Sequence, residues 1–280
     1  MGRSIALVTG ATSGLGHATA RLLAAESYRQ VIVTGRSLAR IKETPAELAT
    51  ETQTQIFTPL ELELDEPSSV QSALAELVRL GRPIDFLLLN AGMVPGKARV
   101  LTAAGIEASQ APLIGHHQLA VGLLRANLLS PTRGSSSRAR NLPEVPNNAY
   151  ADAKLIIAWW VGALARRLPS GMAVYAVSPG AATDTKAVRN AGPALKYLFI
   201  PIVNLIPGMN QTPETAARRY LQASQFGADV SGQFFASAQG KFTGPIEAQR
   251  HPHLHDRASQ EAAWQAVVKV SGIDLLAQQP

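Results

Sequence analysis

The sequence predicts a single α/β domain with a doubly wound parallel sheet between two layers of helices. Short apolar runs alternate with segments of helical periodicity along the 280 residues, a pattern typical of parallel strands joined by right-handed crossovers. The first apolar run ends in a glycine-rich turn, after which a helical pattern begins. Hydrophobic residues make up 46% and charged residues 16% of the chain, which is the composition of a globular domain with one large core.

The expected elements follow one another in a regular order. Apolar runs predict strands at Ile5–Thr9, Val31–Thr34, Phe57–Leu64, Ile84–Leu89, Met172–Val177 and Gly232–Ala236. Helical periodicity predicts helices at Gly14–Ala25, Ser37–Thr50, Pro112–Leu129, Asn147–Leu168 and Thr212–Ser224, the second of them interrupted by Pro45. A further helix should begin at the capping box Ser68–Gln71 and stop at Gly81.

One strand that this order requires is not evident. Between Leu129 and Tyr150 the alternation demands another buried strand, but Ser130–Arg140 is rich in serine and arginine and contains Pro131 and Gly134. This composition is typical of a loop. The sequence leaves open whether the segment joins the sheet.

Composition and charge exclude several classes of function. The chain has no cysteine, which excludes disulfides and thiolate chemistry and fits a cytoplasmic location. The net charge of +6 comes from scattered Lys and Arg residues, which favours basic surfaces and a phosphate-bearing ligand over nucleic acid. We expect no membrane span, since no apolar run reaches about 18 residues, and no signal peptide. We also expect no metal site, although His251, His253 and His255 alternate.

The glycine-rich turn predicts a nucleotide site. Glycines after a strand and before a helix allow a tight turn, so that backbone N–H groups and the helix N-terminus can meet a pyrophosphate. The residues expected at this site are Gly10, Thr12, Ser13, Gly14, Leu15 and Gly16.

Four motifs in order resemble the short-chain dehydrogenase/reductase family. Thr9–Gly16 matches its TGxxxGxG signature, Asn90-Ala91-Gly92 its NAG motif, Tyr150–Lys154 its YxxxK motif and Ser178-Pro179-Gly180 its PG motif. The resemblance implies a Rossmann-type fold and hydride transfer between a nicotinamide dinucleotide and a carbonyl or alcohol carbon. Thr34-Gly35-Arg36 and Gly115-His116 are closest to its retinol-dehydrogenase-like branch.

The end of the second strand favours NADP(H) over NAD(H). NAD-preferring members place an acidic residue there to bind the ribose 2′-hydroxyl, whereas this chain has Gly35 followed by Arg36. A guanidinium pairs well with a 2′-phosphate. By the same resemblance, Asp65 is expected beside the adenine ring, and Asn90, Ala91, Gly92, Pro179 and Gly180 are expected to contact the cofactor.

The YxxxK motif supplies the expected acid and base. Tyr150 and Lys154 are four residues apart and share one face of a helix, and an adjacent ammonium favours the phenolate of a tyrosine. The resemblance implies that Tyr150 exchanges the proton and that Lys154 lowers its pKa and holds the nicotinamide ribose. In the family a serine about 13 residues earlier binds the substrate oxygen. That position is Ser137, with Ser136 and Ser135 beside it.

Two departures from the family pattern bear on catalysis. Thr132-Arg133-Gly134 stands where the family has an apolar strand before the serine, so the serine is weakly supported. Pro112 falls where many members carry an asparagine that organises a water relay to the lysine, and Asn127 is too far along to replace it. His116 and His117 are expected to be packing or surface residues.

These features predict an NADP(H)-dependent oxidoreductase for an apolar alcohol, aldehyde or ketone, with residues 191–211 as an apolar segment that covers the substrate. A dinucleotide-binding protein with lost or weak turnover is the second interpretation. A sugar-nucleotide epimerase is the third, disfavoured because the chain leaves little room for a separate substrate domain. Apolar residues at Ile156, Ile157, Trp159 and Trp160 can cover both a core and a partner helix, which favours a homo-oligomer.

Overall fold

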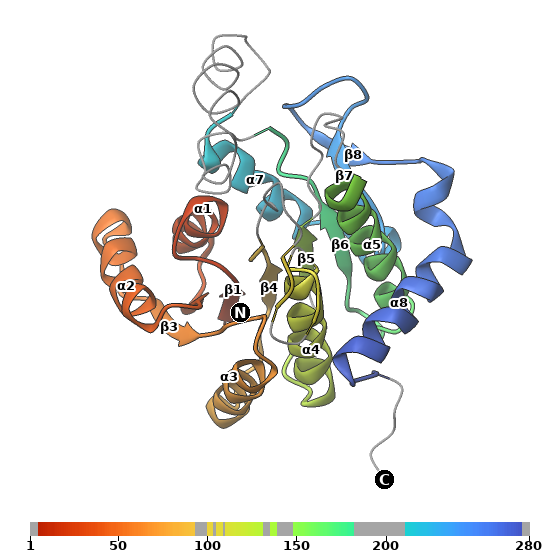
Figure 1. The fold of residues 1–280 in the computed structure, drawn as a ribbon. Coiled ribbons are helices and arrows are strands. Elements are labelled where there is room, and N and C mark those ends of the chain that lie inside the picture. The colour runs from red at the N-terminus through yellow and green to blue at the C-terminus, as the bar shows by residue number, and fades with distance from the viewer. Residues whose placement is uncertain are drawn as a thin grey trace.

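The fold is built on one mostly parallel sheet (Figure 1). The computed structural model describes residues 5–92, 100–102, 105–108, 110–130, 135–138, 148–181 and 211–275. Within these ranges eight strands form a single sheet in the order β3-β2-β1-β4-β5-β6-β7-β8. All neighbouring pairs are parallel except β7 and β8, which are antiparallel.

The strand order reverses its direction between β1 and β4. The strands are β1 Ile5–Val8, β2 Gln30–Gly35, β3 Phe57–Glu61, β4 Phe86–Leu89, β5 Ser135–Arg138, β6 Val174–Val177, β7 Phe234–Ser237 and β8 Ile246–Ala248. From β1 the chain builds outward to β3, then returns to β4 on the other side of β1. Such a reversal defines a doubly wound sheet and opens a crevice at the carboxyl ends of the two strands. The predicted fold class is confirmed.

Helices cover both faces of the sheet, as Figure 1 shows. They are α1 Gly14–Leu23, α2 Leu38–Thr52, α3 Pro67–Leu80, α4 Ala111–Arg125, α5 Asn148–Ala165, α7 Pro213–Ala223 and α8 Arg257–Ser271. Buried residues of α1, α2 and α7 form one apolar cluster with the sheet. Buried residues of α3, α4, α5 and α8 form the other. The three-layer arrangement follows because each face of a buried parallel sheet must be covered.

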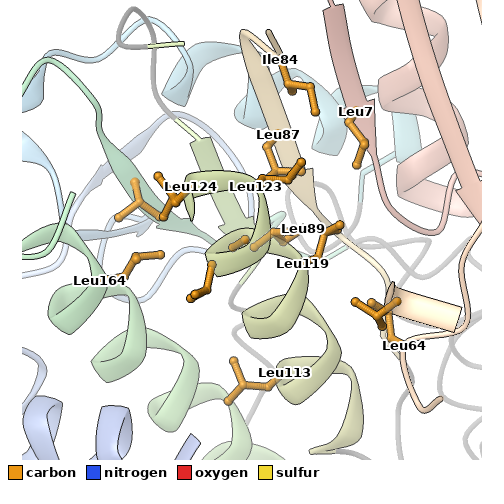
Figure 2. Close-up of a cluster of buried hydrophobic side chains, with 14 of the residues drawn as sticks. Leu7, Leu64, Ile84, Leu87, Leu89, Leu113, Leu119, Leu123, Leu124 and Leu164 are labelled. Carbon is orange, nitrogen blue, oxygen red and sulfur yellow. The ribbon is translucent and has the colours of Figure 1, made fainter. Parts of the chain in front are cut away.

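Leucines dominate the second cluster (Figure 2). Leu7 of β1 and Leu87 and Leu89 of β4 lie beneath Leu119 and Leu123 of α4, and none of the five side chains exposes more than 3% of its surface. Burying one such side chain contributes about 1.5–3 kcal/mol. This packing fixes α4 over the centre of the sheet.

The segment whose structure the sequence left open contains a central strand. Ser135–Arg138 forms β5 and pairs in parallel with β4 on one side and β6 on the other. In this register Ser137 lies beside Leu89 of β4 and Ala176 of β6. A loop interpretation is therefore wrong for residues 135–138, because pairing on both edges satisfies backbone groups that a buried sheet cannot leave open. Thr132, Arg133 and Gly134 lie outside the described residues.

Helix ends show where the local signals were right or wrong. The capping box at Ser68–Gln71 is wrong: α3 begins after Glu66 with a proline in its first turn, and the Ser69 hydroxyl instead accepts a hydrogen bond from the Glu63 N–H at 2.9 Å. Gly81 ends α3 with a φ of 63°, as predicted. Pro45 lies inside α2 without ending it.

Helix α8, which the sequence analysis did not predict, packs along α5. Trp264 of α8 and Trp160 of α5 are fully buried, and the Trp160 indole donates to His117 Nδ1 at 3.0 Å. At Gly162 a Cβ atom would lie 2.4 Å from Gln260 Nε2, so the two helices touch closely there. The apolar surface of α5 that favoured a homo-oligomer is thus covered, at Trp160, by the chain's own C-terminal helix.

The serine-rich composition of β5 predicts weak local protection. Serine contributes little apolar area, so opening this strand costs less than opening a strand of leucine or valine. We expect the amides of Ser135–Arg138 to exchange with deuterium faster than those of Phe86–Leu89 and Val174–Val177, measured in one hydrogen-exchange experiment. Equal protection of all three strands would show that the composition of β5 has no energetic consequence.

Candidate active site

The predicted motifs meet at one edge of the sheet. Gly10, Asn90 and Pro179 follow the carboxyl ends of β1, β4 and β6. Ser137 lies at the level of Leu89 on the neighbouring strand. Parallel strands end at the same edge, so the order β1-β4-β5-β6 brings these segments together.

The glycine-rich turn has no space for side chains at two positions. Gly10 has a φ of 66°, and a Cβ atom there would lie 2.9 Å from the Cα atom of Ala91. A Cβ atom on Gly16 would lie 2.3 Å from Gly10 O and 2.6 Å from Asn90 Nδ2. Helix α1 can therefore begin directly against β1 and the NAG turn, with Gly14 at a φ of 59° and Leu15 buried.

The start of α1 is open to an anion. Ser13 is the N-cap residue and its side chain makes no capping hydrogen bond, so the N–H groups of the first turn are left for another acceptor. Thr12 packs across the neighbouring strand, where a Cβ atom on Gly35 would lie 2.5 Å from its methyl carbon. A closely packed glycine turn at an uncapped helix N-terminus is the arrangement that receives a pyrophosphate.

Thr9 joins the glycine turn to the NAG turn. Its hydroxyl oxygen accepts hydrogen bonds from the N–H groups of Asn90 and Ala91 at 2.8 and 3.0 Å. The Asn90 side chain, itself buried, donates back to Thr9 O at 2.9 Å and to Gly10 O at 3.4 Å. The two turns are therefore locked to one another by both backbone and side-chain groups.

His116 is buried beside this junction. Its Nε2 atom lies 2.9 Å from the Thr9 hydroxyl. Burial, and after it the positive charge of Lys154, lower the pKa of His116 to about 3, so the imidazole is neutral at physiological pH. The effect of Lys154 shows that this residue, on the first half of α5, lies within electrostatic range of His116 on α4. His116 was predicted to be a packing or surface residue; it is buried, and the prediction did not include its contact with Thr9.

Two carboxylates accompany Arg36 at the end of β2. Arg36 is exposed, and its charge acts on both Glu63 and Asp65 after β3. Burial is the main cause that raises the pKa of each carboxyl, and Arg36 opposes it. Arg36, predicted to bind the 2′-phosphate, and Asp65, predicted beside the adenine ring, thus lie within electrostatic range of one another, with Glu63 as a further acid beside them.

A buried arginine fixes the PG turn. Gly180 has a φ of 72°, and its N–H donates to Ser178 Oγ at 3.2 Å. Arg219 of α7, which is 4% exposed, donates to Ser178 O, Ser237 Oγ and Gly244 O. These acceptors are all neutral, so this guanidinium is held by fixed dipoles of the β6, β7 and β8 ends.

The expected catalytic residues lie on two neighbouring elements. Tyr150 and Lys154 are both on α5, and Ser136 and Ser137 are both on β5. The structure describes the backbone of Tyr150, Ser136 and Ser137 but not their side chains.

Pro112 stands where many family members carry the asparagine of the water relay. Pro112 is in the first turn of α4, where its missing N–H removes no helical hydrogen bond. Asn127 follows the last turn of α4, roughly 20 Å away along the helix axis. Asn127 cannot replace the side chain missing at Pro112, as the sequence indicated.

The sequence analysis missed Thr9, Glu63 and Arg219 and undervalued His116. A signal existed for two of them. His116 is three residues from Leu113 and four from Ala120 on the apolar stripe of α4, and Arg219 falls between Ala216 and Tyr220 on the buried face of α7. A polar residue on an apolar stripe needs a buried partner.

Neither a membrane helix nor a metal cluster is found in the described ranges. No helix there is long and apolar enough to cross a bilayer. No three histidine or acidic side chains gather in that part of the chain as metal ligands would. The His251 and His253 rings stack with centroids 5.6 Å apart, and His255 Nε2 lies 3.1 Å from Gln249 O.

Comparison with known proteins decides the family. The family model for short chain dehydrogenase matches residues 4–196. The chain belongs to the short-chain dehydrogenase family. Strands β1 to β6, the glycine turn, the NAG turn and α5 all fall within the matched range.

Several curated proteins are similar to this short-chain dehydrogenase. Serine 3-dehydrogenase of Agrobacterium fabrum is 30% identical over 196 residues, covering 66% of this chain and 75% of its own. Polyprenol dehydrogenase of Mus musculus is 30% identical over 215 residues, covering 69% and 63% of the two chains. Protochlorophyllide reductase B of Oryza sativa subsp. japonica is 25% identical over 318 residues, covering 97% and 78%.

Solved structures agree with the fold. An uncharacterized protein from Mycobacterium paratuberculosis superposes with a TM-score of 0.71 at 23% identity, covering 98% of this chain and 94% of that one. A single-residue variant of actinorhodin polyketide ketoreductase with NADPH gives a TM-score of 0.66 at 24% identity, covering 83% and 94%. At these identities the likeness establishes the architecture of this short-chain dehydrogenase.

The contact at Gly16 predicts a graded response to added methyl groups. Gly16→Ala forces its Cβ atom against backbone of the glycine turn, which cannot move away, so we expect dinucleotide affinity to fall about tenfold or more, or ~1.4 kcal/mol. A Cβ atom in Gly35→Ala comes closer than 3.0 Å only to the Thr12 methyl carbon, which rotation of the Thr12 side chain can move, so this variant should cost about threefold or less. Titration calorimetry measures both. Equal losses in the two variants would contradict the close-packing argument.

Proposed function

We propose that the protein is an NADP(H)-dependent oxidoreductase that transfers a hydride between the nicotinamide and an apolar alcohol, aldehyde or ketone. The observation that carries the proposal is the glycine turn, packed without space for side chains against Asn90 at the sheet edge shared with Lys154 and β5. Family membership supports a dehydrogenase or reductase reaction.

The residues present fit a dinucleotide. A Cβ atom at Gly10 or Gly16 would fill the space between the glycine turn and the NAG turn. Without these side chains, backbone N–H groups of the glycine turn can reach a pyrophosphate. Gly10, Thr12, Ser13, Gly14, Leu15 and Gly16 would hold this phosphate end, while Asn90, Ala91, Gly92, Pro179 and Gly180 would line the nicotinamide end. When bound, the nicotinamide supplies or receives the hydride.

The protein's own contribution is proton transfer and orientation. Tyr150 would exchange a proton with the substrate oxygen through its hydroxyl, and the ammonium of Lys154, one helical turn along α5, would favour its phenolate form. Ser137, or Ser136 beside it, would donate a hydrogen bond to the same oxygen. The pairing of β5 with β4 and β6 supports this role, because a serine on a paired central strand is held more firmly than one on a loop.

NADP(H) is the preferred dinucleotide in this proposal. Arg36 is exposed at the end of β2, next to a glycine rather than an acidic residue, and a guanidinium can pair with a 2′-phosphate through two N–H groups. Glu63 and Asp65 are within electrostatic range of Arg36, and their carboxylates would weaken the attraction between this site and the 2′-phosphate. Similar structures crystallised with NADPH, or with NADP in a Burkholderia cenocepacia enzyme, support the same choice.

The names of the relatives point to two classes of substrate. Polyprenol dehydrogenase and protochlorophyllide reductase are named for apolar substrates, while serine 3-dehydrogenase is named for a polar one. Apolar residues of the 191–211 segment favour an apolar carbonyl compound or alcohol. Apart from Gln211, this segment lies outside the described residues.

A dinucleotide-binding protein with weak or absent turnover is the second candidate. Pro112 in the first turn of α4 favours it, because proline offers neither an amide side chain nor an N–H to organise water near Lys154. Assaying NADPH oxidation against a panel of aldehydes and ketones separates the two candidates once binding is established.

Location and assembly belong to the same proposal. The lack of cysteine favours the cytoplasm. A homo-oligomer would need a surface other than the part of α5 that α8 covers, since Trp160 and Trp264 are buried within one chain.

Replacing Arg36 tests the cofactor preference. Arg36→Asp removes the pairing guanidinium and adds a repulsive carboxylate, so NADPH binding should weaken by about 2–4 kcal/mol while NADH binding changes little. Lys42→Asp makes the same change in net charge at an exposed position of α2, the helix that follows Arg36, and serves as the control. Equal weakening of NADPH binding by both variants would leave only a general charge effect.

Replacing the expected acid–base pair tests the chemistry. Tyr150→Phe removes one hydroxyl, so the fold and NADPH affinity should persist while carbonyl reduction falls by about 100-fold or more. Lys154→Ala should reduce both dinucleotide affinity and turnover. The measurements are titration calorimetry and the decay of NADPH absorbance. A Tyr150→Phe variant that keeps most of its activity would overturn the assignment.

A further inference from the structure

The Thr9 hydroxyl has four polar groups within hydrogen-bond distance but only one proton and two lone pairs. Its oxygen accepts from Asn90 N and Ala91 N at 2.8 and 3.0 Å, which occupies both of its lone pairs. One proton remains to be donated. The two acceptors within reach are Leu88 O at 3.2 Å and His116 Nε2 at 2.9 Å.

The competition favours His116. Leu88 O already accepts from Thr9 N at 2.9 Å and shares the Asn90 N–H, at 3.1 Å, with the Thr9 oxygen. It is also farther from the Thr9 hydroxyl than His116 Nε2 is, at 3.2 Å against 2.9 Å. A protonated Nε2 on His116 would have to donate to the Thr9 oxygen, which already accepts from Asn90 N and Ala91 N. The network therefore assigns an unprotonated Nε2 that accepts from Thr9, with the ring proton on Nδ1.

The surroundings of His116 maintain this neutral state. The side chain is 6% exposed, and Lys154 on α5 adds a positive charge that disfavours a second one on the ring. A ring held neutral in this way can accept a hydrogen bond permanently but cannot carry protons during a reaction at neutral pH.

His116 also connects the junction to a rigid part of α4. The neighbouring Gly115 approaches the loop after β3 so closely that a Cβ atom would lie 2.3 Å from Leu64 O. This contact sets how closely α4 approaches the loop after β3. Pro112 is one turn earlier on the same helix face.

We propose that His116 is a positioning residue of the dinucleotide site, which accepts a hydrogen bond from the Thr9 hydroxyl and so holds the NAG turn against the glycine turn. The inference rests on the proposed function in so far as these turns bind a dinucleotide. It goes beyond that function by assigning a role to an imidazole that touches neither substrate nor cofactor in the mechanism.

The adjacent histidine provides a matched control. His117 is also buried on α4, but its Nε2 lies 2.8 Å from Ile273 O and its Nδ1 accepts from the Trp160 indole. These partners belong to the helix layer and the C-terminal segment. A substitution at His117 should lower stability without reaching the Thr9 junction.

The first test needs no cofactor. Amide exchange of Asn90 and Ala91, whose N–H groups bind Thr9, is measured by NMR in the full chain. His116→Leu should speed their exchange about tenfold or more, whereas His116→Gln, whose carbonyl can replace Nε2 as acceptor, should stay within about threefold of the original protein. His117→Leu should lower the melting temperature and leave these two amides within the same limit.

The second test joins Thr9 and His116 in a double-mutant cycle. Thr9→Val alone should speed the same amides and weaken NADPH binding, and adding His116→Leu to it should change neither quantity further, because the shared hydrogen bond is already lost. His116→Leu alone should weaken NADPH binding about tenfold, and His116→Gln about threefold or less. Thr9→Val also keeps the proposal testable if His116→Leu fails to fold.

The outcomes separate this proposal from the function on which it rests. If the unmodified protein binds neither NADPH nor NADH, the proposed function is wrong, but the amide exchange of Asn90 and Ala91 still decides the role of His116. Unchanged exchange and affinity in His116→Leu, equal effects of His117→Leu, additive effects with Thr9→Val, or no rescue by His116→Gln would each overturn the assignment.

Discussion

The rest of the structure depends on the contact between the glycine turn and the NAG turn. Gly16 touches Gly10 O and Asn90 Nδ2 with no space for a Cβ atom, and the Thr9 hydroxyl joins the same two segments. This contact brings α1, β1 and β4 together at the point where the sheet reverses its strand order. The close contact therefore lies at the strand reversal and fixes how near the helix N-terminus, which an anion would meet, comes to the NAG turn.

Helices α4, α5 and α8 stabilise the elements around this junction. Leucines of α4 pack on β1 and β4. Helix α8 packs on α5 through Trp264 and Gln260, and its Glu261 forms an ion pair at 2.6 Å with Arg167, just after the end of α5. The Arg167 guanidinium also lies 4.5 Å from the centre of the Trp264 ring. Because α5 carries Tyr150 and Lys154, the C-terminal helix would contribute to the proposed site by fixing the helix that bears them.

Sequence patterns predicted the elements whose signals are local or periodic. The parallel strands β1 and β4 are continuous apolar runs, and Gly10 and Gly81 have a left-handed backbone that favours glycine, so these could be predicted. Gly16 could be predicted from its place in the glycine motif, although a contact with Asn90 is what leaves no space for a side chain there. The strand β5 could not, since Ser135–Arg138 has no apolar signal and is held as a strand by pairing with β4 and β6. Tertiary pairing there overrides local propensity.

The site was predictable to a similar extent and for similar reasons. Motif residues such as Asn90 and Gly180 could be assigned because their spacing matches a known series. The role of His116 depends on Thr9 and Lys154, which lie on other elements, and a linear pattern does not contain that proximity. Arg219 likewise acquires its partners only when β6, β7 and β8 come together.

The central claim is that this junction holds a dinucleotide that carries a 2′-phosphate. The most direct measurement is a calorimetric titration of the unmodified full chain with NADPH and, separately, with NADH. The account predicts saturable binding at one site per chain, with NADPH bound about tenfold or more tightly than NADH. Failure of both nucleotides to saturate the protein at millimolar concentration would contradict the dinucleotide site, and tighter binding of NADH would contradict the role of Arg36.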